Sequence, residues 1–230
     1  MEVERSILGR RWCLRPCDAA TALAISQRHG VPELVGRVLA GRGIGLAEAA
    51  GFLHPRLREW LPDPSHLHDL DAAAARLAQA ARTGEPVGLI GDYDVDGASA
   101  TALVARYLTS LGAPTTFLIP DRLKDGYGPN PGLLDALAAQ GCRLVVTLDT
   151  GTTAFAPLEH AAAQGLDVIV IDHHTAEPRL PPALAVVNPN RADQASPLRH
   201  LAAVGVAYRF LEVLYEACGR RLDTSAFIDL

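Results

Sequence analysis

Short apolar runs alternate with longer alanine-rich stretches from about residue 85 of this 230-residue chain. The short runs are rich in Val, Ile and Leu and have the length of strands, whereas the stretches between them carry apolar residues at helical spacing. Strands that are apolar on both faces are typical of parallel sheets covered by helices on each side. We therefore predict an α/β fold with a doubly wound, mostly parallel five-stranded sheet and helices on both faces. The predicted strands are 86–90, 115–119, 143–148, 167–171 and 184–187, and the predicted helices are about 98–111, 131–140, 153–164 and 201–217.

The first 80 residues have a different character. Their composition is typical of helices, interrupted by glycines and prolines, and no strand is evident there. We therefore predict two domains, a small helical N-terminal region over residues 1–80 and the sheet domain over residues 81–230.

The formal net charge of -5 argues against a protein that binds nucleic acid through a uniformly basic surface. It remains compatible with a site that gathers carboxylates around bound cations. The four cysteines form no CxxC pair, no secretory leader is evident, and no apolar run approaches the ~20 residues of a membrane span. We expect a soluble, cytoplasmic protein that makes no contact with membranes.

Acidic residues and histidines follow three of the predicted strands at their carboxyl ends. In an open parallel sheet these ends line one edge, and ligands bind there at the point where the strand order reverses. We therefore expect three clusters that are distant in sequence to converge. They are Asp92, Asp94 and Asp96 after the first strand, Asp149 after the third, and Asp172, His173 and His174 after the fourth.

A single Asp after a strand is more often a helix cap or a turn residue than a functional group. Three such clusters close together would repel one another and raise each other's pKa unless cations lay among them. Oxygen and imidazole ligands without thiolates favour Mn²⁺ or Mg²⁺ over structural zinc. The pattern therefore favours a site for divalent metal ions.

Two further interpretations concern the same residues. The run from Asp92 to Gly97 also matches the opening of a calcium-binding EF-hand loop, but the twelfth position holds Leu103 in place of Glu and a strand precedes the loop. We therefore reject a calcium loop. One of the adjacent histidines could simply be packed in the fold, or one could ligate a metal while the other contacts a phosphate oxygen or the leaving group.

The segments GDYDVDG (91–97), TLDTG (147–151) and VIDHH (170–174) resemble, in this order, the first three motifs of the DHH phosphoesterase family. The segments DRLKDGYGPN (121–130), VVNPNR (186–191) and LAAVGVAYRF (201–210) resemble the branch of that family formed by single-stranded-DNA-specific exonucleases. The resemblance implies metal-dependent 5′-to-3′ hydrolysis of phosphodiester bonds in single-stranded DNA, for DNA repair and recombination. It also implies two divalent ions, Mn²⁺ or Mg²⁺, and a single-strand-binding protein as a candidate partner.

Roles for individual residues follow from the same resemblance. It implies catalytic roles for Asp149 and His174. It implies contact with the substrate for Arg122, Tyr127 and His174. It implies metal ligation by Asp94, Asp96, Asp149, Asp172 and His173, with Asp92 as a further ligand or a neighbour of the ligands.

In that family a last acidic motif completes the metal site and a second domain closes the substrate cleft. Here the acidic motif would begin just after residues 227–230, so we expect a C-terminally incomplete DHH domain whose independent activity is an open question. Two alternatives remain. One is a DHH phosphatase acting on short oligonucleotides or cyclic dinucleotides, and the other is a non-catalytic DHH-like scaffold of the replication machinery. The intact acidic and histidine motifs favour an active lineage.

Overall fold

The computed structural model describes residues 4–56 and 63–220. The chain divides into two compact units, residues 1–61 and 62–230. The described part of the first unit contains short helices around a small core of Ile25, Leu39 and Ala49. These helices are α1 (Ala19–His29), α2 (Glu33–Gly41) and α3 (Ala49–Leu53).

The second unit alternates strands with helices along its sequence, as the apolar pattern predicted. Its helices are η1 (Pro64–His66, a 3₁₀ turn), α5 (Leu70–Thr83), α6 (Val95–Ser110), α7 (Pro131–Ala139), α8 (Phe155–Ala163) and α9 (Ala203–Ala217). Its strands are β1 (Val87–Gly91), β2 (Thr115–Leu118), β3 (Leu144–Leu148), β4 (Asp167–Ile171) and β5 (Ala185–Val187).

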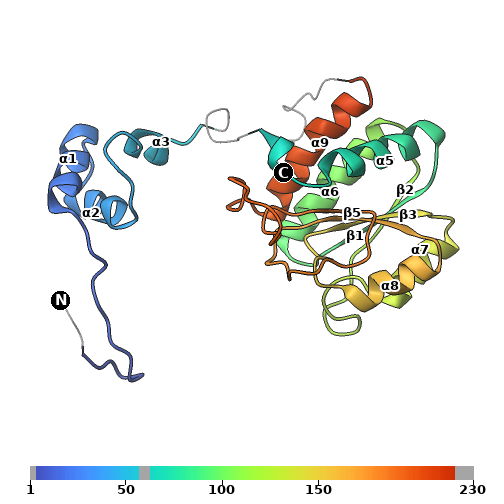
Figure 1. Ribbon diagram of the computed structural model, residues 1–230, viewed down its shortest axis with the longest axis horizontal. Helices are drawn as coiled ribbons and strands as arrows, with labels where there is room; N and C mark the ends of the chain where they lie inside the picture. Colours follow the sequence, from blue (N-terminus) through green and yellow to red (C-terminus); the bar gives the residue numbers. More distant parts are fainter. Residues whose placement is uncertain (1–3, 57–62, 221–230) are drawn as a thin grey trace. The chain divides into compact units, whose positions relative to one another are not determined.

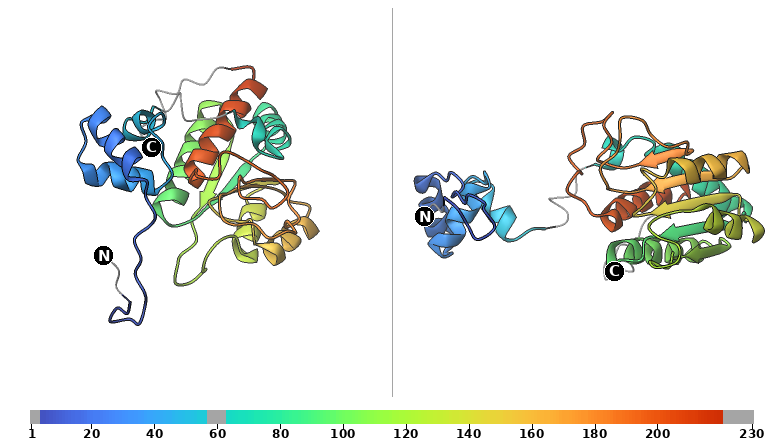
Figure 2. Two further views of the ribbon diagram at one scale, coloured as in Figure 1. Left: turned by 60° about the vertical axis from the view of Figure 1, so that its left-hand side comes forward. Right: turned by 90° about the horizontal axis from the view of Figure 1, so that it is seen from below.

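The five strands form one parallel sheet in the order β2-β1-β3-β4-β5. Figure 1 shows α5, α6 and α9 on one side of this sheet and α7 and α8 on the other, and the left view of Figure 2 shows the same layers. The predicted fold class is therefore confirmed. Each strand agrees with its predicted bounds to within a residue, whereas α6 begins at Val95, before the predicted 98. It begins early because the Asp94 side chain caps it, accepting hydrogen bonds from the amides of Asp96 and Gly97.

Alternate residues of β1, β3, β4 and β5 enter two separate cores. In β3, Val146 packs in the core shared with α5, α6 and α9, whereas Val145 packs in the core shared with α7 and α8. This two-sided burial is the reason that these four strands are mostly apolar on both faces, whereas the edge strand β2 is only partly buried and begins with two threonines. Within the described residues, none of the helices has the length and apolar character that a membrane span requires.

Helix α5 belongs to the compact unit that contains the sheet, although the predicted domain boundary at residue 80 falls inside this helix and assigns most of it to the N-terminal region. Composition alone places this helix with the N-terminal region, but its buried residues Leu70, Ala73 and Leu77 pack in the core that also contains α6 and α9. The chain therefore divides between residues 61 and 62. The division into functional domains, 1–80 and 81–230, stays a proposal.

The strand order reverses between β1 and β3, because the chain passes from β1 outward to β2 and then returns to the other side of β1. This is the position where open parallel sheets bind ligands, just beyond the carboxyl ends of the strands. Asp92 follows β1 and Asp149 follows β3, so both carboxylates lie at the reversal.

Candidate metal centre

The turn that follows β1 places two carboxylates beside the sheet edge. The Asp92 amide donates to the Leu148 carbonyl at 3.1 Å, which continues the pairing of β1 with β3 by one residue. Asp92 is buried, and its Oδ1 has no hydrogen-bond partner among the described residues. Burial raises the pKa of Asp92, and the neighbouring Asp94 carboxylate adds to this effect. Helix α6 approaches the turn so closely that a Cβ at Gly97 would lie 2.6 Å from the Asp92 backbone, so the position requires glycine.

Asp149 lies at the centre of the site. It directly follows β3 with a φ of 62°, a left-handed conformation that is uncommon for residues other than glycine and that often marks functional sites. Its side chain is 2% exposed, and within the described part of the chain its Oδ1 has no hydrogen-bond partner. Burial, together with the nearby carboxylates of Asp96 and Asp94, raises its pKa to about 8. A buried carboxylate held among others in this way is stabilised by a cation.

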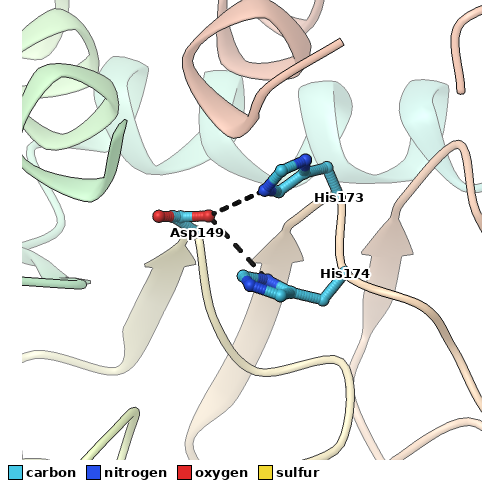
Figure 3. Close-up of side chains that lie close together, drawn as sticks. All are labelled: Asp149, His173 and His174. Atoms are coloured by element: carbon cyan, nitrogen blue, oxygen red, sulfur yellow. Dashed lines mark ion pairs between the residues drawn. The ribbon is translucent and has the colours of Figure 1, made fainter. Parts of the chain in front are cut away.

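The two histidines that follow β4 both face Asp149 (Figure 3). His173 Nε2 lies 3.3 Å and His174 Nδ1 lies 3.8 Å from Asp149 Oδ1. His173 Nε2 also lies 3.5 Å from Asp96 Oδ2. Both imidazoles therefore reach the same buried carboxylate, and neither is packed away on the opposite face of the sheet.

Asp172 fixes the orientation of the histidine pair. Its Oδ1 accepts hydrogen bonds from the amides of His173 and His174 and from His174 Nδ1 at 2.7 Å, and its Oδ2 accepts one from the Thr152 amide. Burial opposes ionisation of Asp172, but the hydrogen bonds from His174 and Thr152 outweigh it and lower the pKa to about 2. The same bond raises the pKa of His174 to about 9. Asp172 and His174 therefore form an ion pair at neutral pH.

Asp96 connects the site to α9. Its Oδ2 accepts a hydrogen bond from the Ala203 amide and its Oδ1 accepts one from the Val204 amide, both at 2.8 Å. These amides are the unsatisfied donors at the start of α9, so Asp96 acts as a cap supplied from a distant part of the chain. In this geometry both oxygens of Asp96 are already engaged by backbone.

Among residues 4–56 and 63–220, two groups of side chains have ligand atoms within 4.8 Å of one another, and both contain Asp149. One group is Asp149 with His173 and His174, and the other is Asp149 with Asp92 and Asp94. The oxygen and imidazole donors, and the unpartnered Oδ1 atoms of Asp92 and Asp149, fit hard or borderline divalent cations. The predicted ligands Asp96 and Asp172 lie beside these groups, with their oxygens engaged by backbone amides and by His174. The assignment of individual ligands stays a prediction.

The predicted substrate residues occupy different places. The Tyr127 hydroxyl donates to the Asp149 carbonyl at 2.9 Å and lies 3.4 Å from His174 Nδ1, so this side chain borders the metal centre. Burial, followed by the charges of Asp172 and Asp149, raises the pKa of Tyr127 and keeps its hydroxyl protonated. Arg122 is exposed, and its guanidinium lies 5.2 Å from the centre of the Tyr93 ring.

Sequence reasoning missed one side chain at this edge. Asn188 directly follows β5, is fully buried, and donates to the Thr152 hydroxyl and to the His174 carbonyl. It occupies the same position relative to its strand as Asp92, Asp149 and Asp172. The rule that identified the acidic residues therefore also marks Asn188, once uncharged polar residues are included.

The N-terminal domain of the DHH family matches residues 86–228 of the chain. This match covers every strand and the whole of the site. The chain belongs to the DHH family. The resemblance of the three acidic and histidine motifs to this family, noted from the sequence, is confirmed.

Within the DHH family, the chain is similar to RecJ proteins. It is 36% identical over 205 residues to the single-stranded-DNA-specific exonuclease RecJ of Bacillus subtilis, which covers 89% of this chain and 26% of that protein. It is 38% identical over 185 residues to the Escherichia coli protein of the same name, covering 80% of this chain and 31% of the relative. A structure of RecJ from Thermus thermophilus in complex with Mn²⁺ superimposes with a TM-score of 0.67 at 30% identity, covering 90% of this chain and 28% of that one. The chain thus spans only about a quarter to a third of the length of these relatives.

Proposed function

We propose that this DHH chain forms the metal-binding part of a nuclease that hydrolyses phosphodiester bonds in single-stranded DNA, using two divalent ions, Mn²⁺ or Mg²⁺. The observation that carries the proposal is the position of Asp149. This buried carboxylate is shared by two groups of ligand atoms at the point where the strand order reverses. A shared central carboxylate is suited to a pair of metal ions. The name of the relatives in Bacillus subtilis and Escherichia coli supports single-stranded DNA as the substrate.

The residues of the chain have distinct tasks in this proposal. Asp92, Asp94, Asp149 and His173 would hold the cations, which when bound supply Lewis-acid stabilisation of phosphate oxygens and activate water. His174, whose pKa is raised to about 9 by Asp172, carries a proton at neutral pH and can donate it to a phosphate oxygen or to the leaving oxygen.

Substrate contacts would extend from the metal centre toward the loop after β2. The Tyr127 hydroxyl is held by the Asp149 carbonyl, so its ring stands at the border of the site, half-exposed, where a base or sugar can pack against it. The exposed Arg122 guanidinium can bind a backbone phosphate through two parallel hydrogen bonds. Both residues are proposed as the substrate-holding group.

The wider setting is proposed from the family relationship. It comprises 5′-to-3′ polarity, action in DNA repair and recombination, a cytoplasmic location, and association with a single-strand-binding protein. These properties belong to the complete protein, of which the chain matches a part.

The test is a nuclease assay on the full gene product that contains this chain, with 5′-labelled and 3′-labelled single-stranded DNA in Mn²⁺ or Mg²⁺. We expect Asp149→Ala to lower the rate more than ~100-fold, because it removes the shared ligand. The matched control is Asp135→Ala, an exposed aspartate paired with His160 on the neighbouring helix, which should retain the wild-type rate. An unchanged rate in Asp149→Ala would refute the assignment. Cleavage confined to short oligonucleotides or cyclic dinucleotides would instead indicate a DHH phosphatase, and absence of both metal binding and hydrolysis would indicate a scaffold.

A further inference from the structure

Two asparagine side chains beyond β5 bind the backbone carbonyls of both site histidines. Asn190 Nδ2 donates to the His173 carbonyl at 2.6 Å. Asn188 Nδ2 donates to the His174 carbonyl at 2.9 Å and to the Thr152 hydroxyl at 2.8 Å. The segment that follows β5 is thereby joined to the loops that follow β4 and β3. The backbone of the histidine pair is held from one side by Asn188 and Asn190, which we call the asparagine pair.

The asparagine pair is itself held in place by further hydrogen bonds. The Asn190 amide donates to Asn188 Oδ1 at 2.8 Å, so the two residues form a tight turn across the intervening proline. Gln194 Nε2 donates to the Asn188 carbonyl, and the Gln194 side-chain oxygen accepts a hydrogen bond from the His68 amide. This turn is therefore anchored to the segment that precedes α5.

A buried arginine fixes the other end of the same segment. Arg191 is 5% exposed and donates to the Val186 carbonyl in β5 and to the carboxylates of Asp69 and Asp193. Asp69 also accepts a hydrogen bond from the Val186 amide, and it adopts a φ of 61°. A buried guanidinium with two carboxylate partners and a carbonyl is fully engaged, which makes this anchor rigid.

Amides suit this task better than carboxylates. A carbonyl is only an acceptor, so a donor is required to hold it, and an amide provides that donor without charge. An additional carboxylate here would repel both carbonyls and would add to the negative charge that already raises the pKa of Asp149. The histidine rings are thus oriented by Asp172, and their backbone by the asparagine pair.

We propose that Asn188 and Asn190 are positioning residues of the metal centre, which fix the backbone of His173 and His174 so that both rings face Asp149. The link to metal binding rests on the proposed function, whereas the effect on the loop itself does not. Hydrogen-bond partners that orient ligands typically change metal affinity 10–100-fold when they are removed.

The test compares Asn190→Asp with the matched control Asn130→Asp in the 230-residue chain. Asn130 uses its side-chain oxygen to accept the Leu133 amide at the start of α7, so a carboxylate preserves that bond. At Asn190 the same change replaces the donor that holds the His173 carbonyl. Asn190→Ala, which removes the donor without adding charge, serves as a second variant if Asn190→Asp does not fold.

Two measurements separate the possible outcomes. Amide hydrogen exchange at His173 and His174, recorded in EDTA, should become faster in the Asn190 variants and stay unchanged in Asn130→Asp. Calorimetric titration with Mn²⁺ should show ~10–100-fold weaker binding in the Asn190 variants alone. Unchanged exchange, or faster exchange with unchanged Mn²⁺ affinity, would overturn the positioning role. If the wild-type chain bound no Mn²⁺, the proposed function would fail, while the exchange result would still decide whether the asparagine pair holds the loop.

Discussion

Replacing Asp149 with Asn should stabilise the metal-free chain and should remove the stabilisation that bound Mn²⁺ provides. In the metal-free chain, Asp149 is buried among other carboxylates, and its pKa is about 8 compared with an ordinary value of 3.8. A folded-state pKa above the unfolded value means that the folded chain binds this proton more tightly. The contribution of this proton to the free energy of unfolding is complete below pH 3.8 and is lost as the pH rises to about 8. Asparagine does not ionise, so the variant should not lose this stability as the pH rises.

The size of the effect follows from the difference between the two pKa values. At ~1.4 kcal/mol per pH unit, the wild-type chain should lose roughly 5–6 kcal/mol through this group between mild acid and alkaline pH. For a domain of this size, ~1 kcal/mol corresponds to about 2–4 °C in Tm. We therefore expect metal-free Asp149→Asn to melt ~10 °C or more above the wild type at pH 9, and close to it at pH 4. In saturating Mn²⁺ this difference should narrow by ~2.7 kcal/mol, since ligand at 100 times its Kd stabilises only the wild type by that amount.

The assay is scanning calorimetry of both chains at pH 4, 7 and 9, in EDTA and in Mn²⁺. The proposed destabilisation of ionised Asp149 by burial and by the nearby carboxylates would be refuted if metal-free Asp149→Asn were less stable than the wild type at pH 9. It would also be refuted if the two chains had the same dependence on pH. A shift with Mn²⁺ in the variant as large as in the wild type would show that the ion binds elsewhere.

Three further predictions concern the same site. Mn²⁺ affinity should rise about tenfold per pH unit from pH 6 toward 8, with release of about one proton, because the ion displaces the proton of Asp149. Calorimetric titrations in buffers of different ionisation enthalpy count that proton, and an affinity that does not change with pH would contradict the prediction. Tyr127→Phe removes the hydroxyl that donates to the Asp149 carbonyl, so urea unfolding should show a free energy of unfolding lower by ~0.5–1.5 kcal/mol, while Mn²⁺ still binds. An unchanged free energy of unfolding would count against that hydrogen bond. Gly97→Ala places a Cβ 2.6 Å from the Asp92 backbone, which should lower the free energy of unfolding by ~1–3 kcal/mol and weaken Mn²⁺ binding. A variant as stable as the wild type would show that α6 can move away from the turn.

The sheet could be predicted because its strands are short, mostly apolar on both faces apart from the edge strand β2, and separated by helices of ordinary length. The convergence of Asp92, Asp149 and His173 followed from one geometric rule, that parallel strands end at the same edge. These are local patterns, and each strand could be identified without knowledge of its neighbours.

The features that could not be predicted depend on contacts between distant parts of the chain. Asp96 caps α9, which begins more than a hundred positions later, and nothing near Asp96 in the sequence indicates that bond. The anchoring of Arg191 by Asp69 joins residues 122 positions apart. The placement of α5 with the sheet likewise depends on its packing in the core shared with α9, which its alanine-rich composition does not reveal.

The proposed function requires Asp149 to be shared between two bound metal ions. This can be tested with a crystal of the chain soaked in Mn²⁺, in which anomalous diffraction locates the metal. We expect two anomalous peaks in contact with Asp149, one on the side of Asp92 and Asp94 and one on the side of His173. Absence of Mn²⁺ at this edge of the sheet, in crystals that diffract well and contain saturating metal, would contradict this expectation.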